Sequence, residues 1–168
     1  GEPHDHHDAY GENMGEWCAS CHGDYINDSH KHPSGNGQYL NGEATSYNSY
    51  VATGDLTGDV TTSYLALVPF ELQETDPAVL VARSVSLEGP DSTNNVMCLT
   101  CHRAHASAFN NITRWDTETT EFLAHSLPGA TQLAAMGAIP DSAYYGRDIG
   151  TEFGEYQRSL CNKCHIQD

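Results

Sequence analysis

Residues 98–105 read C-L-T-C-H-R-A-H, and their first five letters spell C-x-x-C-H. On one helical turn, positions i, i+3 and i+4 share a face, so Cys98, Cys101 and His102 point to the same side. Two thiols on that face can bond the two vinyl groups of one porphyrin while the imidazole reaches the iron. This spacing is therefore the attachment signature of c-type haem. His105 follows three residues later and offers a second imidazole close by.

The same signature occurs at residues 18–22 (C-A-S-C-H) and 161–165 (C-N-K-C-H), and the three motifs use all six cysteines of the chain. Disulfides would not require a histidine after every second cysteine, and zinc sites usually pair two C-x-x-C units at short separation. The sequence therefore predicts three covalently attached c-type haems. The predicted haem-binding residues are Cys18, Cys21, His22, Cys98, Cys101, His102, Cys161, Cys164 and His165.

Length and composition agree with a single haem-bearing domain over residues 1–168. Only 38% of the residues are hydrophobic, and three buried porphyrins would supply the apolar core that the side chains do not. We expect a multihaem cytochrome c fold with a haem core, mostly coil, short α-helices and little β-structure. The pattern predicts a helix over 155–164. Short strands or a hairpin are expected within 47–53 and 60–68, which are rich in Tyr, Val and Thr.

The chain carries 7 basic and 23 acidic residues, a formal net charge of −16. Such a chain should not bind nucleic acid or an anionic membrane surface through charge. No stretch approaches the roughly 20 apolar residues of a membrane-spanning helix, so no membrane insertion is expected. Because haem c is attached outside the cytoplasm, we expect an exported protein whose mature, processed chain starts at Gly1.

Ten histidines minus three motif histidines leave seven for three distal iron positions. Methionine is an alternative ligand, but this excess of histidine favours two imidazoles on each iron. Bis-histidine haem is low-spin and of low potential, whereas a methionine ligand raises the potential. With both axial positions filled, no substrate can bind the iron. The pattern therefore predicts electron transfer and not an enzyme.

Two segments supply candidate distal ligands. Residues 1–16 are polar, unlikely to pack alone, and form an N-terminal arm that can contact a neighbouring subunit. In residues 30–33 (H-K-H-P), both histidines point to one side of an extended chain, so only one is expected to reach a given iron. The favoured distal ligands are His7, His32 and His105. The alternates are His4, His6, His30 and His125.

Three segments resemble the extracellular multihaem cytochromes of metal-reducing bacteria: residues 96–107 (V-M-C-L-T-C-H-R-A-H-A-S), residues 114–116 (R-W-D) and residues 160–165 (L-C-N-K-C-H). Several members of that class polymerise into filaments called cytochrome nanowires. The resemblance implies closely packed haems running through the subunit, and a histidine of one subunit completing a haem of its neighbour. It also implies that His105 is the distal ligand of an adjacent haem and not of its own.

The sequence is thus interpreted as that of a triheme electron-transfer cytochrome, the repeating subunit of a head-to-tail extracellular homopolymer. Its other partners would be redox donors and extracellular acceptors. A soluble periplasmic electron shuttle and a haem enzyme with one open iron site are the alternatives.

Overall fold

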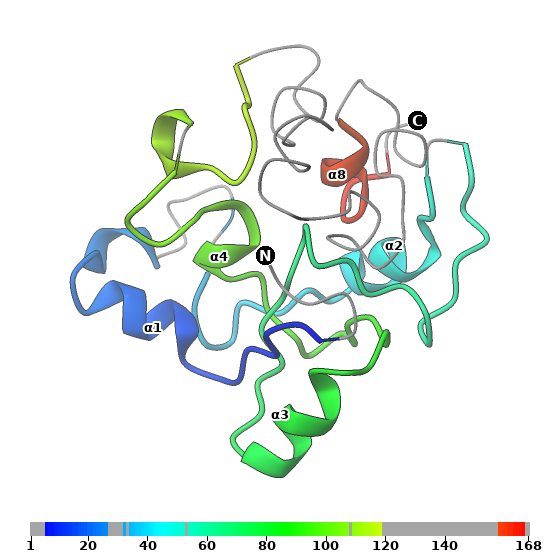
Figure 1. Cartoon of the computed structure of the whole chain (residues 1–168), viewed down its shortest axis with the longest axis horizontal. Helices are drawn as coiled ribbons and strands as arrows, with labels where there is room; N and C mark the ends of the chain where they lie inside the picture. The colour runs from blue at the N-terminus through cyan, green and yellow to red at the C-terminus, as the bar shows by residue number, and fades with distance from the viewer. Residues whose placement is uncertain are drawn as a thin grey trace, which may run out of the picture.

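The computed structural model describes residues 6–26, 32, 34–52, 54–107, 109–118 and 158–166. Across these residues, short helices are joined by long irregular segments (Figure 1). The α-helices are α1 (Met14–Ala19), α2 (Glu43–Ser49), α3 (Pro77–Arg83), α4 (Cys98–Cys101) and α8 (Arg158–Asn162), and the 3-10 turns are η1 (Gly23–Tyr25) and η2 (Asn110–Ile112). The β-pairing found in this part of the chain consists of isolated bridges. The predicted fold, mostly coil with short helices and little β-structure, is confirmed.

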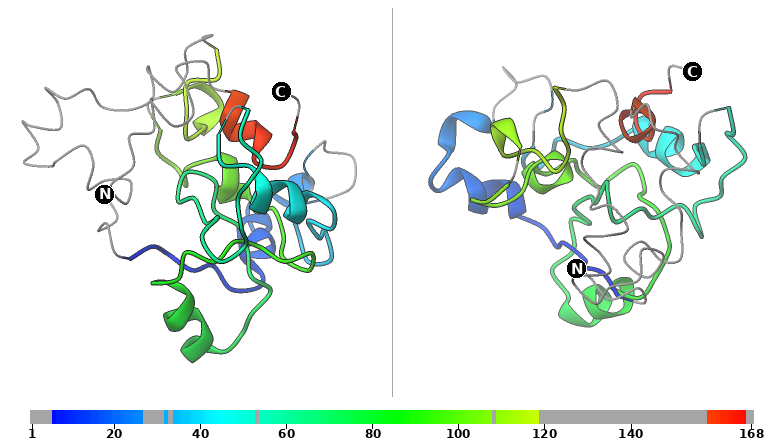
Figure 2. Two further views of the ribbon diagram at one scale, coloured as in Figure 1. Left: turned by 90° about the vertical axis from the view of Figure 1, so that its right-hand side faces the viewer. Right: turned by 45° about the horizontal axis from the view of Figure 1, so that its top comes forward.

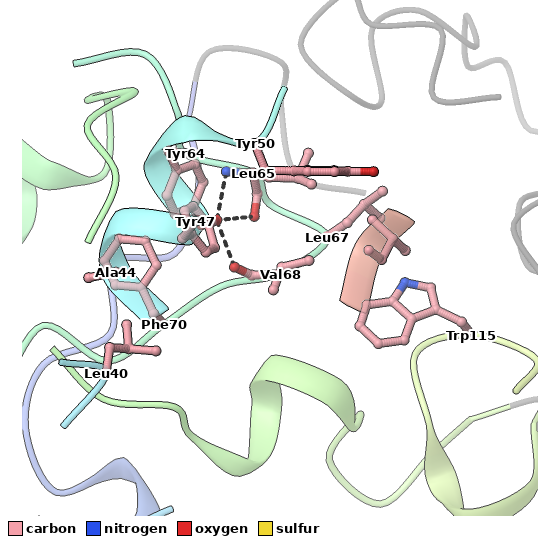
Figure 3. Packing of buried hydrophobic residues seen from close by; sticks show 11 residues of the cluster. Leu40, Ala44, Tyr47, Tyr50, Tyr64, Leu65, Leu67, Val68, Phe70 and Trp115 are labelled. Carbon is pink, nitrogen blue, oxygen red and sulfur yellow. Dashed lines mark hydrogen bonds between the residues drawn. The ribbon is translucent and has the colours of Figure 1, made fainter. Parts of the chain in front are cut away.

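An aromatic cluster forms the centre of the described core (Figure 3). We call Tyr47, Tyr50, Tyr64 and Phe70 the tyrosine core. The ring of Phe70 meets those of Tyr47 and Tyr64 edge to face, with centroids 5.6 and 5.8 Å apart. Such pairs each add about 1 kcal/mol beyond the area that they bury. Tyr50 has no exposed surface. A sizeable apolar core is therefore built from side chains alone.

The hydroxyl of Tyr47 ties α2 to the segment that follows it. It accepts a hydrogen bond from the backbone N–H of Leu65 at 3.0 Å and donates to the carbonyl of Val68 at 2.9 Å (Figure 3). Buried tyrosine hydroxyls usually find such partners. Here one hydroxyl replaces the strand pairing that would otherwise satisfy these backbone groups.

The predicted strands at 47–53 and 60–68 are wrong, because residues 47–49 belong to α2 and no strand forms in the described part of 60–68. Strand propensity is weak where tertiary packing decides. Leu40, Ala44 and Tyr47 recur at i, i+4 and i+7, a helical spacing, and all three are buried.

Residues 6–16 lie along α3 and the segment before it (Figure 2). The backbone N–H of His7 donates to the carbonyl of Ser84 at 2.9 Å, and that of Leu72 donates to the carbonyl of Tyr10 at 2.8 Å. The expectation that the N-terminal segment does not pack against its own chain is therefore wrong for these residues. Backbone hydrogen bonds hold it, and a polar sequence gives no sign of them.

A buried lysine joins the C-terminal helix to the tyrosine core. Lys163 is only 2% exposed, and its Nζ donates to the carbonyls of Tyr47 (2.9 Å), Tyr50 (2.8 Å) and Ser63 (3.0 Å). The carbonyls of Tyr47 and Tyr50 lie at the C-terminal end of α2, where a cation is favourable. The helix α8, within the predicted range 155–164, is thereby fixed beside α2 (Figure 1).

Candidate haem sites

Each C-x-x-C-H motif forms one turn of helix, as its spacing predicts. The backbone N–H of His22 donates to the carbonyl of Cys18 at 3.0 Å, and that of His102 donates to the carbonyl of Cys98 at 2.9 Å. The third motif repeats this bond between residues 165 and 161, at 2.9 Å. In each motif the two thiols and the imidazole therefore share one helical face, which is the arrangement that one porphyrin requires.

The three motifs lie next to one another, with α4 between α1 and α8 (Figure 1). The thiols of Cys18 and Cys98 are close enough to interact, which joins the first motif to the second. On the other side of α4, Cys101 is close enough to Cys161 and Cys164 to interact electrostatically with both. The second motif is thus in contact with both others, so groups attached to the three motifs would form a continuous row.

Two pairs of imidazoles face each other across motif boundaries. The ring centroids of His22 and His105 lie 6.4 Å apart, and those of His32 and His165 lie 5.8 Å apart. An imidazole nitrogen binds a first-row metal at about 2 Å, so two imidazoles on opposite sides of one iron place their ring centroids roughly 6 Å apart. Both pairs have the separation of axial ligands that share an iron.

These pairs are formed between segments that are distant in the sequence. His105 follows the second motif but faces the histidine of the first. His32 follows the first motif but faces the histidine of the third. The residues present therefore fit haem, because a second imidazole stands opposite two of the three motif histidines.

The histidine of the second motif is oriented by a backbone group. The Nδ1 of His102 lies 2.9 Å from the carbonyl oxygen of Asn111. Since a carbonyl only accepts, Nδ1 carries the proton and Nε2 is left with a lone pair for iron. Asn111 has a φ of 57°, a left-handed conformation that asparagine tolerates better than most residues. This positioning group was missed in the sequence, where only the Asn110-Asn111 pair hints at a turn.

His7 has a different environment from the other predicted ligands. It is 7% exposed and stacks on Tyr64, with ring centroids 3.8 Å apart and planes 18° from parallel. Burial, with a smaller contribution from the Arg83 cation, lowers the pKa of His7 to about 4. This position favours a packing role in place of the predicted distal ligation. His6 is exposed, and His4, His30 and His125 lie outside the described residues.

The cysteine environments disfavour thiolate chemistry. Burial raises the pKa of Cys18 and of Cys101 to about 11, and that of Cys164 to about 12. Redox dithiols and zinc ligands require lowered thiol pKa values. No disulfide joins any of the six cysteines, all of which are described, and no cluster of three metal-ligating side chains occurs in the described ranges. The thiols are thus suited to one covalent attachment and not to redox cycling.

Two buried charged side chains beside the motifs could not be found from the sequence. Lys163 lies inside the third motif, in the contacts given above. Glu71 is 1% exposed and accepts hydrogen bonds from the backbone N–H of Gly15 (3.4 Å) and from the side-chain amide of Gln73 (2.5 Å). Gly15 belongs to α1, so Glu71 lies beneath the helix of the first motif. Lys163 and Glu71 each form a hydrogen bond with a residue far away in the sequence, Tyr47 and Gly15 respectively.

Known proteins with a similar sequence and fold were found. Over 182 aligned positions the chain is 41% identical to the C-type cytochrome OmcS of Geobacter sulfurreducens, an alignment that covers 95% of this chain. The Outer Membrane Cytochrome S filament of that organism superimposes with a TM-score of 0.73 at 40% identity, and a cryo-EM structure of OmcS nanowires with a TM-score of 0.72 at 39% identity. The predicted resemblance to multihaem c-type cytochromes is confirmed.

The two solved structures match 95% of this chain and 44% of theirs, and the relative is matched over 41% of its length. The chain therefore spans less than half the length of the cytochromes it resembles. No family model matches the sequence. The helices of the described residues are all too short to cross a membrane. The similarity supports haem c as the cofactor of this chain.

Proposed function

We propose that this chain transfers electrons through three covalently bound c-type haems. The first haem is attached at residues 18–22, the second at 98–102 and the third at 161–165. When bound, each haem supplies a one-electron iron couple. The chain's own residues hold the three groups in contact, and irons with histidine in both axial positions are closed to substrates.

The observation that carries this proposal is the presence of two imidazole pairs, each formed between residues distant in the sequence. We assign His22 and His105 to the first iron, and His165 and His32 to the third, on the separations of 6.4 and 5.8 Å. His102 is assigned to the second iron. Its distal ligand is sought among His4, His6, His30, His125 and a histidine of a neighbouring subunit.

We further propose that the chain works outside the cell, within the subunit of a head-to-tail filament. The relatives whose structures match are described as filaments and nanowires. A contact between two different surfaces of one subunit propagates as an open helix instead of closing a ring. A histidine supplied across that contact to the second iron would join two subunits by a coordinate bond.

Intact mass and axial ligation test the haem assignment. The mass of the folded protein should exceed that of the polypeptide by three haems, with no cysteine open to alkylation. His105→Ala and His32→Ala should each make one iron high-spin and able to bind carbon monoxide. The matched His105→Met and His32→Met variants should stay low-spin at a higher potential, because methionine replaces imidazole as a ligand. Low-spin spectra in both alanine variants would refute the assigned pairs.

Negative-stain microscopy of purified material tests the assembly. Filaments support the polymer, whereas uniform single particles with three low-spin haems would indicate the periplasmic shuttle. A wild-type protein with one high-spin iron that binds carbon monoxide rapidly would instead indicate an enzyme with an open site. The His4→Ala, His6→Ala double variant should lose filaments while keeping three haems if these N-terminal histidines form the joint.

A further inference from the structure

We propose that two buried charges of opposite sign, Glu71 beneath the first haem motif and Lys163 within the third, make the third haem hold an electron in preference to the first. This inference rests on the proposed function, since it assumes haems at both motifs. It goes further by predicting that the third haem has a higher reduction potential than the first.

The positive charge is fixed by its partners. The Nζ of Lys163 donates to three carbonyls at 2.8–3.0 Å, and three acceptors require all three protons of an ammonium group. The ring of Tyr47 lies 4.5 Å from the same Nζ. With this side chain 2% exposed, water screens the charge little. Lys163 separates Asn162 from Cys164, so the cation is built into the motif that attaches the third haem.

The negative charge is fixed in the same way. The carboxylate of Glu71 accepts hydrogen bonds from the backbone N–H of Gly15 and the side-chain amide of Gln73. Burial raises the pKa of Glu71, and the hydrogen bond from Gly15 acts in the opposite direction by stabilising the ionised carboxylate. Glu16 of α1 adds a second carboxylate nearby, which interacts electrostatically with Glu71. Two acidic groups therefore lie at the first haem motif, Glu71 in contact with α1 and Glu16 within it.

Each charge acts on the atoms that would carry its haem. Burial, the neighbouring Cys101 and the Glu43 carboxylate raise the pKa of Cys164, and the Lys163 cation acts in the opposite direction on this thiol. Glu43 is exposed, so water screens its charge, whereas Lys163 is buried. Burial and the neighbouring Cys98 raise the pKa of Cys18, and Glu71 acts in the same direction. The fields of the two charges thus reach the sulfur atoms through which the third and first haems are attached.

The redox consequence follows from the sign of each field. An electron passes from a ferrous first haem to a ferric third haem, which leaves the first ferric and the third ferrous, and no bond forms or breaks. A nearby cation stabilises the added electron, and a nearby anion opposes it. A unit charge about 10 Å away in a medium of effective dielectric 20 changes a one-electron equilibrium roughly tenfold. The second haem motif, in which Arg114 acts electrostatically on Cys101, lies in space between the first and third motifs.

The order of reduction in the wild-type protein tests the proposal directly. Stepwise potentiometric reduction would be followed by NMR of the haem methyl groups. Signals of the first haem are those altered by His105→Met, and signals of the third are those altered by His32→Met. The third haem should be reduced before the first. Reduction of the first haem before the third overturns the proposal, even if both charges are buried as described.

Variants then separate the two charges. Lys163→Met should make the third haem about tenfold less reduced at a fixed potential, which is about 59 mV for a one-electron couple. Lys163→Arg keeps the charge and should keep the order of reduction. Glu71→Gln should make the first haem about tenfold more reduced, with a similar shift of about 59 mV in the opposite direction. Asp59→Asn, which removes an exposed carboxylate, is the matched control and should leave the order unchanged.

The outcomes distinguish this inference from the proposed function. A wild-type protein with fewer than three haems, or with high-spin irons, contradicts the proposed function. Three low-spin haems whose potentials shift equally in Lys163→Met contradict only the inference. If Lys163→Met does not retain its haem, two tests of the inference remain. One is the order of reduction in the wild type, and the other is the shift in the potential of the first haem in Glu71→Gln.

Discussion

The tyrosine core and the haem face are built in different ways. In the core, aromatic rings pack edge to face, the Tyr47 hydroxyl satisfies backbone groups, and Tyr50 is fully enclosed. On the haem face, the helices are short, with α1 of six residues and α4 of four, and the motif histidines His22, His102 and His165 are exposed. One region buries its own side chains, whereas the other presents reactive groups outward.

This contrast indicates how the protein can be both sparse in apolar residues and ordered. Helices this short are marginal alone and depend on tertiary contacts. The haem face obtains those contacts from the core, through Lys163 of the third motif and through Thr100 of the second, whose hydroxyl donates to the carbonyl of Pro69 at 2.7 Å. The tyrosine core is therefore the scaffold on which the haem motifs are held in register.

The largest effect is expected from opening a cavity in the scaffold. Tyr50→Ala should lower the free energy of unfolding by about 3–5 kcal/mol, the usual cost of truncating a buried aromatic residue. Guanidinium denaturation of the haem-loaded protein measures this change. The matched control is Tyr39→Ala at a residue that is 47% exposed, where the change should be much smaller than at Tyr50. Equal effects at both positions would mean that the tyrosine core is not the scaffold.

A second effect depends on pH. Burial lowers the pKa of His7 to about 4, so between pH 6.5 and pH 4 the unfolded chain binds the proton and the folded chain does not. The contribution of His7 to the free energy of unfolding is fully present above pH 6.5. It falls by up to about 3 kcal/mol as the pH approaches 4. His7→Phe keeps a ring against Tyr64 and should remove this part of the pH dependence. If the free energies of unfolding of the wild type and His7→Phe changed equally from pH 7 to pH 4, His7 would not be the source of this pH dependence.

A smaller effect is expected from one hydroxyl of the core. Tyr47→Phe keeps the ring but leaves the N–H of Leu65 and the carbonyl of Val68 without their buried partner. The cost should be about 1–3 kcal/mol. Amide exchange should show the loss of protection first at Leu65. Unchanged protection at that amide would show that the hydroxyl is not what connects α2 to this segment.

The smallest effect is a coupling between the two regions. His105→Ala removes a proposed iron ligand on the haem face, and Tyr47→Phe weakens the core. If the scaffold stands independently of the first haem, the two changes should add to within about 0.5 kcal/mol in a double-mutant cycle. A larger coupling would show that the first haem and the tyrosine core fold as one unit.

Short-range features of the fold could be predicted from the sequence, and long-range ones could not. The motif turns and the helix near residue 160 follow from spacing over a few residues. Residues 47–49, predicted as part of a strand because tyrosine favours strands on average, belong to α2, since burial of Tyr47 against Phe70 decides here. The packing of residues 6–16 was missed because backbone hydrogen bonds have no signature in residue type.

The sequence by itself determined which residues we propose as haem attachment sites, since two thiols and an imidazole on one helical turn are a local property of C-x-x-C-H. Tertiary structure alone decided which imidazole faces which, because His105 and His32 each approach the histidine of a different motif. It also decided where Lys163 and Glu71 place their charges. Contacts between residues distant along the chain arise only when the packed core brings them together, so no local pattern encodes them.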